Sequence, residues 1–276
     1  MQGFSNTFLI FFYQIAVGGL LALAGTPFHE IERAFYKSTA GVLYVMALLG
    51  LWGKVPLYGR ALAEELHWGL VLEVLFHIGF ILFFSGYMIS LWGERQVFRA
   101  RAFALSVLTG LAGLLFSARS FYSAPFLSVE TLVYPGTFVL SSLLLGSVTV
   151  GMLIGHWYLI DTGQSLEPFV RIYKFFVFAL VIQCGFFWLA TAGLYLLGSV
   201  ESLTGLKRLW EHHSTLLLMR LGVGQIAPLL LAWMIWRTLL IPHTMAATGL
   251  FYIALLGVFV GEILGRQILA LTSLPF

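Results

Sequence analysis

The stretch VLEVLFHIGFILFF, residues 71–84, places a carboxylate and an imidazole inside an apolar run. Glu73 and His77 are four residues apart, so on a helix they share one face. A charged side chain at the centre of a lipid-facing helix costs roughly 2.5–3.5 kcal/mol. The stretch therefore predicts a membrane helix whose polar face is turned toward other helices.

Composition extends this prediction to the whole chain. The 276 residues are 60% hydrophobic and 10% charged, with a mean hydropathy of +0.95, whereas soluble domains are about 25% charged. The sequence predicts an all-α polytopic membrane protein, a single membrane domain over residues 1–276 with no soluble domain. A spanning helix needs about 20 mainly apolar residues, and eight segments provide them: 7–25, 38–56, 68–92, 102–118, 134–160, 172–197, 214–240 and 244–271.

The two halves of the chain resemble each other. VGGLLALAGTPFHEIERAFYKS, from Val17, is matched by VGMLIGHWYLIDTGQSLEPFVRIYKF, from Val150. Each half holds four helices, an even number, so the repeats have parallel rather than inverted topology. The expected architecture is two parallel-repeat four-helix bundles, residues 1–130 and 131–276. The first apolar run lacks a positive leader and exceeds a signal-peptide core in length, so it is expected to be the first membrane helix.

Lysine and arginine set the orientation, because cytoplasmic loops are enriched in both. The connections after the first, third, fifth and seventh helices hold eight of these residues, and the other face holds five, including Lys54. This predicts a bacterial-type inner membrane protein with both termini on the outer, periplasmic side. The two longest connections, residues 119–135 and 198–214, have the aromatic and charged side chains of short interfacial helices.

Seven polar side chains interrupt the predicted spans at a common depth. At a rise of 1.5 Å per residue, each lies roughly 8–16 Å below the outer surface. Ionisable groups inside a membrane mark sites or pathways by default, so the set predicts one functional pocket in the outer half of the bilayer. Its members are Gln14, Glu73, His77, Arg220, Gln225, Glu262 and Arg266.

Two interpretations of these residues stay open. The carboxyl group of Glu73 and the imidazole of His77 suit proton transfer. Alternatively, Arg220–Glu262 or Glu73–Arg266 are buried pairs that only fix the register of the helices.

Other features of the spans are less specific. His156 and Asp161, at the inner end of the fifth helix, are candidates for an inner-side proton path or a ligand, although Trp157 and Tyr158 there are typical of an interfacial belt. Glycines at a four-residue spacing in the last helix predict a close-packing face. Pro228 frees the carbonyl of Gly224 and predicts a kink.

Redox centres held by this chain alone are not expected. Cys184 is the one cysteine, so iron–sulfur clusters, cysteine-type zinc and covalent haem must belong to a partner. A b-haem needs two histidines at similar depth on neighbouring helices, but His77 and His156 lie toward opposite faces. His77 and His213 differ in depth by roughly two helical turns. His29 and His156 both lie toward the inner face, but His29 is in a loop. No b-haem, no metal site and no nucleic-acid partner are predicted.

The architecture, together with the glycine-rich first helix YQIAVGGLLALAG (residues 13–25), resembles the NrfD-like family. This family includes the membrane anchors of polysulfide reductase and dimethyl sulfoxide reductase. The resemblance covers the whole chain as architecture and transfers no single residue. It implies a quinone, menaquinone or ubiquinone, in the outer pocket, with Glu73 and His77 exchanging its protons.

The resemblance also implies a hetero-oligomeric respiratory complex in the lipid membrane. An extrinsic iron–sulfur, molybdopterin, hydrogenase or multihaem cytochrome subunit is then expected on the outer face, and this chain is a quinone-reactive subunit rather than a free enzyme. Two alternatives remain: a secondary transporter or ion- or proton-conducting subunit, and a purely structural anchor.

Overall fold

The computed structural model describes residues 4–26, 28, 30–64, 68–125, 127–161, 163–241 and 243–276. Within these ranges the chain has no β-strand, and eight helices are long and apolar enough to cross a membrane. The predicted all-α polytopic membrane protein is confirmed. His29, considered above as a haem ligand, lies outside the described residues.

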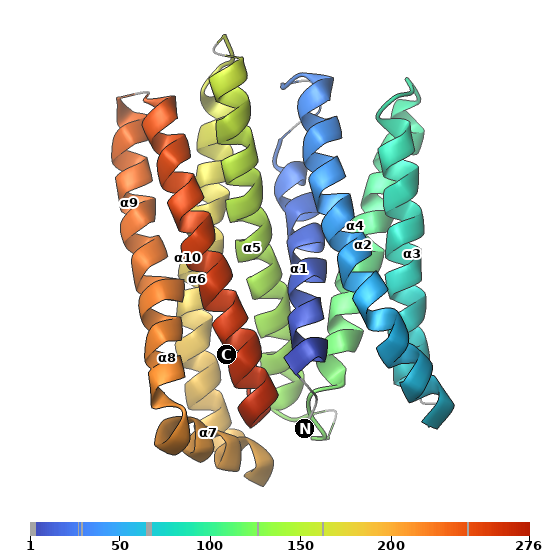
Figure 1. The fold of residues 1–276 in the computed structure, drawn as a ribbon, viewed down its shortest axis with the longest axis vertical. Coiled ribbons are helices and arrows are strands. Elements are labelled where there is room, and N and C mark those ends of the chain that lie inside the picture. The colour runs from blue at the N-terminus through green and yellow to red at the C-terminus, as the bar shows by residue number, and fades with distance from the viewer. Residues whose placement is uncertain are drawn as a thin grey trace.

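The helices follow one another with short connections (Figure 1). The seventh span is a continuous helix made of α8, a π-helical turn η1, and α9. The bounds are α1 (Phe4–Ala24), α2 (Arg33–Glu64), α3 (Trp68–Ser90), α4 (Gln96–Arg119), α5 (Glu130–Ile160), α6 (Glu167–Leu197), α7 (Val200–His212), α8 (Ser214–Leu221), η1 (Gly222–Ile226), α9 (Ala227–Leu240) and α10 (Thr244–Thr272).

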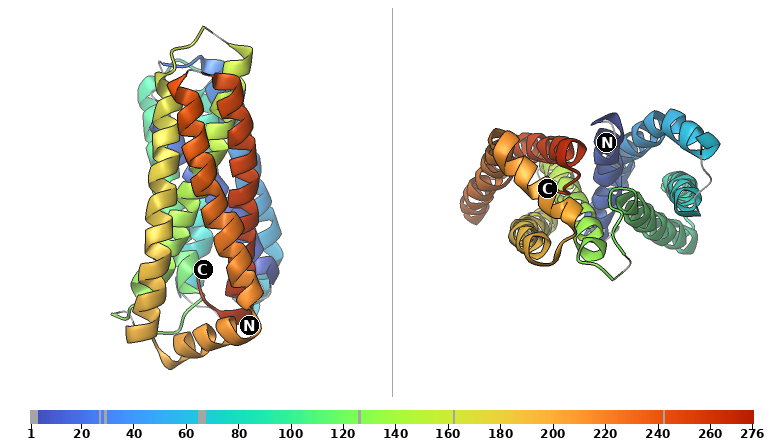
Figure 2. Two further views of the ribbon diagram at one scale, coloured as in Figure 1. Left: turned by 90° about the vertical axis from the view of Figure 1, so that its left-hand side faces the viewer. Right: turned by 90° about the horizontal axis from the view of Figure 1, so that it is seen from below.

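The spans form two bundles. In the first, α2 packs on α1 and α3, and α4 packs on α3 and α1; in the second, α5, α6, the α8–α9 helix and α10 pack together. Where the bundles meet, α1 lies along α5, α4 touches α5 and α10 touches α1 (Figures 1 and 2). A parallel repeat would equate α1 with α5 and α4 with α10; the repeat itself stays a prediction.

Contact between α1 and α5 is close enough to involve the backbone. A Cβ added to Gly146 of α5 would overlap the backbone of Gly18 in α1, and one added to Gly18 would overlap the carbonyl of Ser142. Small residues allow such an approach, which in a membrane replaces the hydrophobic drive for association. The α1 helix is accordingly the central helix, with Ala16 and Val17 fully buried.

One end of the molecule, here called the α7 end, carries α7 and the ends of α2, α4 and α10 (Figure 1). The amphipathic α7 crosses this end at a steep angle to the spans (Figure 2). Its predicted formation from residues 198–214 is confirmed, whereas the described residues of 121–129 form turns and no helix. Ser199 caps α7, and the buried carboxylate of Glu130 accepts hydrogen bonds from the Ser199 N–H (2.7 Å) and the Ser202 hydroxyl (2.8 Å).

After α10 the chain turns back into the second bundle. Ser273 has a left-handed backbone (φ 61°), and its carbonyl accepts a hydrogen bond from the Tyr134 hydroxyl (2.5 Å). Leu274 and Phe276 are buried, and the ring of Phe276 lies 5.0 Å from that of Phe187 in α6. This tail, residues 273–276, closes the α7 end of the second bundle.

Candidate functional site

The predicted single pocket is wrong, because its residues separate into two clusters. The α3 helix, with Glu73 and His77, packs on α2 and α4, whereas α10, with Glu262 and Arg266, packs on α5, α8, η1, α9 and α1. Figures 1 and 2 place α3 and α8 on opposite sides of the molecule. Each bundle therefore has its own buried polar cluster, and both lie in the half of the molecule nearer the α7 end.

The α3 cluster, in the first bundle, centres on Glu73. One carboxylate oxygen accepts hydrogen bonds from the Lys54 ammonium (2.7 Å), the Ser117 hydroxyl (2.7 Å) and the Tyr58 hydroxyl (2.9 Å). Lys54, Tyr58 and Glu73 are each at most 8% exposed. The ion pair to Lys54 replaces the predicted pair with Arg266.

His77 lies beside this carboxylate with one ring nitrogen free. Its Nδ1 is 2.8 Å from the Glu73 carbonyl oxygen, so Nδ1–H donates there. Its Nε2 is buried with no hydrogen-bond partner, and its ring stacks on Tyr13 of α1 at 4.0 Å. This neutral tautomer leaves Nε2 as an unused acceptor.

Lys54 was counted above as a loop residue, and the structure corrects that assignment. The predicted helix ended at residue 56, but α2 continues through Pro56 to Glu64. Lys54 and Tyr58 extend a buried stripe with Ala47 and Gly50, at spacings of three and four residues. This helical period was the available signal for a buried lysine.

The α10 cluster, in the second bundle, contains two arginines and one carboxylate. Glu262 pairs with Arg220 at 2.7 Å, one of the two buried pairs considered in the sequence, and with Arg266 at 3.6 Å. Gln183 of α6, a residue missed in the sequence, donates to Glu262 (2.6 Å) and to Ser141 of α5 (3.2 Å). No other described carboxylate pairs with either arginine, so the cluster has a net charge of +1.

The π turn explains how Arg220 and Gln225 both come to face inward. The Ala227 N–H bonds to the carbonyl of Gly222, five residues back, which adds one residue to the turn before Pro228. Turns of this kind occur frequently at functional sites. Here Gly224 contacts Gly261 of α10, so the predicted glycine face of α10 packs on the distorted turn.

Three donors of this cluster are buried without an acceptor. They are Nε of Arg220, Nε of Arg266 and Nε2 of Gln225. All three residues are at most 5% exposed. A buried donor without a partner costs about 1–3 kcal/mol, and no solvent compensates for it at membrane depth. The arrangement is suited to an added group that offers oxygen acceptors or negative charge.

Gln14 lies between the two clusters rather than in either. Its side-chain amide donates to the Phe138 carbonyl in α5 (2.8 Å), and its Oε1 is buried without a donor. The Arg266 guanidinium lies 4.7 Å from the centre of the Phe138 ring. Phe138 of α5 therefore contacts both Gln14 of α1 and Arg266 of α10 at the bundle interface.

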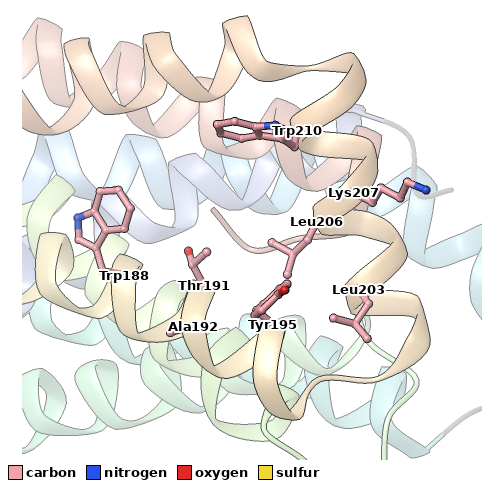
Figure 3. Close-up of a pocket in the computed structure, with 8 residues that line it drawn as sticks. All are labelled: Trp188, Thr191, Ala192, Tyr195, Leu203, Leu206, Lys207 and Trp210. Atoms are coloured by element: carbon pink, nitrogen blue, oxygen red, sulfur yellow. The ribbon is translucent and has the colours of Figure 1, made fainter.

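An apolar groove lies beside the α10 cluster. A cavity of about 660 Å³ separates α6 from α7, with Trp188, Thr191 and Tyr195 facing Leu206 and Trp210 (Figure 3). It shares walls with a second cavity of about 240 Å³ that extends along α8 to Phe276.

Phe187 and Phe276 line both this groove and a third cavity of about 10 Å³, where Arg220, Gln183 and Gln225 meet. That last space holds about one water molecule. The groove thus ends at an aromatic wall, and the unpaired donors of Arg220 and Gln225 lie behind it.

The residues predicted at the inner side form no common site. His156 is exposed, and its Nδ1 is 3.1 Å from the Tyr252 hydroxyl of α10. The Asp161 carboxylate instead accepts bonds from the Gly163 N–H (3.3 Å) and the Gln164 amide (2.5 Å), within its own loop. Among the described residues, no three His, Cys, Asp or Glu side chains come close enough to hold a metal ion.

Comparison of the chain with protein-family models, with curated proteins and with solved structures finds no match.

Proposed function

We propose that the chain is the quinone-reactive integral membrane subunit of a respiratory electron-transfer complex. The α10 cluster is its quinone site, and the groove between α6 and α7 is the way in. The observation that carries the proposal is the set of three buried donors without acceptors, on Arg220, Gln225 and Arg266.

A quinone head group fits the chemistry of these donors. It offers two carbonyl oxygens that accept hydrogen bonds. Its reduction to the quinol takes up two electrons and two protons. Arg220 and Gln225 would hold and orient such an oxygen, and the cluster's net charge of +1 favours negative charge developing on it. The aromatic rings of Phe187 and Phe276 provide flat apolar surface beside the donors.

The groove suits the isoprenoid tail. Its walls are mainly Trp, Leu and Phe side chains, and it opens on the surface beside α7. Because the space at the donors holds only about one water molecule, binding of a quinone head group requires Phe276 and the rest of the C-terminal tail, residues 273–276, to shift. Lys207 and Tyr195, at the outer part of the groove, are amphipathic side chains typical of a membrane interface.

The α3 cluster supports a second function, transfer of protons. Glu73 carries three hydrogen bonds, and His77 next to it keeps an unused ring nitrogen. In the quinone proposal this cluster exchanges protons with the α7 end. In the alternative, a proton-conducting subunit, it acts without a quinone.

Orientation and partner follow from the charge distribution. With Lys54 buried inside α2, the α7 end keeps four of the counted lysines and arginines against eight at the opposite end. The proposal therefore puts the α7 end on the periplasmic side of a bacterial inner membrane, where an extrinsic iron–sulfur, molybdopterin, hydrogenase or multihaem cytochrome subunit docks. Affinity purification of the native complex, with identification of its subunits, tests this part.

The quinone site is tested by Gln225→Leu. Since the Gln225 amide has no acceptor in the structure, its loss leaves the free energy of unfolding unchanged or higher. Binding of a photoreactive quinone to the purified chain should weaken about tenfold, which corresponds to about 1.4 kcal/mol. Gln183→Leu is the matched control for a structural role, because it removes bonds already made to Glu262 and lowers stability.

A Gln225→Leu variant that binds quinone as tightly as the wild type contradicts the site. Failure of the wild type itself to bind or cross-link to quinone contradicts the function, and leaves proton conduction or a structural anchor.

A further inference from the structure

A separate cavity lies at the end of the molecule opposite α7, far from both clusters. It measures about 370 Å³ and is enclosed by the end of α1, the start of α2, the end of α3 and the start of α4. Its walls combine aromatic side chains with one charged group. The residues used below are Phe28, Tyr36, Tyr87, Gln96, Arg99 and Phe103.

Arg99 is buried here with its charge unpaired. It is 7% exposed, and no described carboxylate forms an ion pair with it. One guanidinium nitrogen donates to the carbonyls of Gly93 (2.7 Å) and Ser90 (3.2 Å), at the end of α3. Its Nε is buried with no partner. Capping of the end of α3 therefore uses one nitrogen of the Arg99 guanidinium group, and Nε is left without an acceptor.

A second guanidinium shares the same aromatic ring. The central carbon of Arg99 lies 4.0 Å from the centre of the Phe28 ring, and that of Arg33 lies 5.9 Å from it. Two like charges near one ring repel each other, and because Arg33 is exposed, solvent screens part of this repulsion. Arg33 also has no ion pair among the described residues. An anion in the cavity beside Arg99 would offset the repulsion that remains.

The start of α4 adds a further feature. Gln96 is its first residue, and no side chain caps the helix there. The free N–H groups and the positive end of the helix dipole attract anions, and here they act together with a buried guanidinium that needs an acceptor.

We propose that this cavity binds a phosphate group. The planar fork of arginine matches phosphate oxygens better than other side chains do. The phosphate belongs either to an anionic phospholipid, whose chains would lie along Phe103 and Tyr87, or to a small soluble phosphate.

The test uses the full-length chain purified in detergent and native mass spectrometry. One arm adds phosphatidylglycerol, a second adds zwitterionic phosphatidylcholine, and a third adds inorganic phosphate alone. We expect at least tenfold stronger retention of phosphatidylglycerol than of phosphatidylcholine. Displacement of that lipid by inorganic phosphate assigns recognition to the phosphate alone, and persistence of the lipid assigns it to the phosphate together with the chains.

Arg99→Gln should reduce retention of phosphatidylglycerol at least tenfold. Arg101→Gln is the matched control, because Arg101 lies on the same helix, is exposed and does not line the cavity. It makes the same change of charge and should behave as the wild type. Equal retention by Arg99→Gln and the wild type overturns the proposal. Equal retention of the two lipids excludes the phospholipid as the source of the phosphate, and together with no retention of inorganic phosphate it overturns the proposal.

Gln96→Glu keeps the test valid if Arg99→Gln fails to fold. It leaves the bonds from Arg99 to α3 intact, and an acidic residue in the first turn favours the helix. The new carboxylate lines the cavity and repels phosphate, so retention should again fall. Undiminished retention in this folded variant is also a result against the phosphate site.

Discussion

The ion pair between Lys54 and Glu73 connects α2 to α3 inside the membrane region. Both side chains are at most 6% exposed. Such pairs add little net stability, because removal of both charges from water offsets their attraction. Breaking one is different, since the remaining charge stays buried. This asymmetry makes the pair measurable.

Lys54→Met should lower the free energy of unfolding by about 3–5 kcal/mol, because it leaves Glu73 charged and unpaired. The double variant Lys54→Met/Glu73→Gln should regain at least half of that loss, since it removes both charges and keeps an acceptor. Equilibrium unfolding in mixed micelles measures both. Lys174→Met, at an exposed position of α6, should change the value by less than about 0.5 kcal/mol. If the two substitutions lower the free energy of unfolding additively, Lys54 and Glu73 do not form a direct ion pair.

At this scale the sequence predicts which residues are unusual, but not their partners. Glu73, Arg220 and Glu262 stand out because a charged residue in an apolar run is costly. Their depth follows from counting residues along each helix. The ion-pair partner of each residue depends on which helices are neighbours, and the sequence pattern of a single helix does not contain this information. Glu73 thus pairs with Lys54 and not with Arg266.

Among the elements, the π turn η1 and the glycine contacts determine how closely helices approach. Gly261 of α10 faces Gly224 of η1, and Gly146 of α5 faces Gly18 of α1. Glycine spacing in α10 made the first contact predictable. Pro228 indicated a distortion but not its type, because a kink and an added residue both relieve the missing N–H.

Gly146→Ala should lower the free energy of unfolding by about 1–3 kcal/mol, since the new methyl group overlaps the backbone of α1. Gly185→Ala is the matched control: no atom lies within 4 Å of its added Cβ, and alanine is the better helix former by about 1 kcal/mol. Thermal unfolding in detergent should therefore separate the two variants. Equal stability would mean that α1 and α5 are less closely packed than described.

The tail after α10 gives a prediction about access to the α10 cluster. Phe276→Ala removes the ring between the groove and the cavity at Arg220 and Gln225. Labelling by the photoreactive quinone should then become faster by several fold, with the tightness of binding changed less. Phe186→Ala, on the same cavity but outside the groove, should leave the rate unchanged. A slower rate in Phe276→Ala would indicate that the ring holds the ligand rather than blocks its path.

For the molecule as a whole, all eight spans were predictable from hydropathy, and their ends were not. The second helix runs to Glu64 instead of residue 56 because a proline is tolerated in a membrane helix whose neighbours compensate the freed carbonyl. The two-bundle arrangement followed from the repeat. The error was to assume that equal depth meant one pocket, whereas two clusters at similar depth lie in separate bundles.

Orientation can be measured in a Cys184→Ala background. Lys207→Cys lies on α7 and Arg101→Cys at the other end, and both side chains are exposed. If the α7 end faces the periplasm, a membrane-impermeant maleimide labels position 207 in intact cells, and position 101 only after permeabilisation. The reverse pattern would invert the proposed topology and move the quinone site to the cytoplasmic half.

The central place of α1 also has a consequence for biosynthesis. The α1 helix, Phe4–Ala24, is made well before its main partner α5, which begins only at Glu130. At about 5–20 residues per second, α1 waits on the order of ten seconds before that partner leaves the ribosome. During this interval its glycine-lined face is exposed to lipid or to the insertion machinery. Assembly of this protein therefore depends on how the membrane protects α1 until α5 arrives.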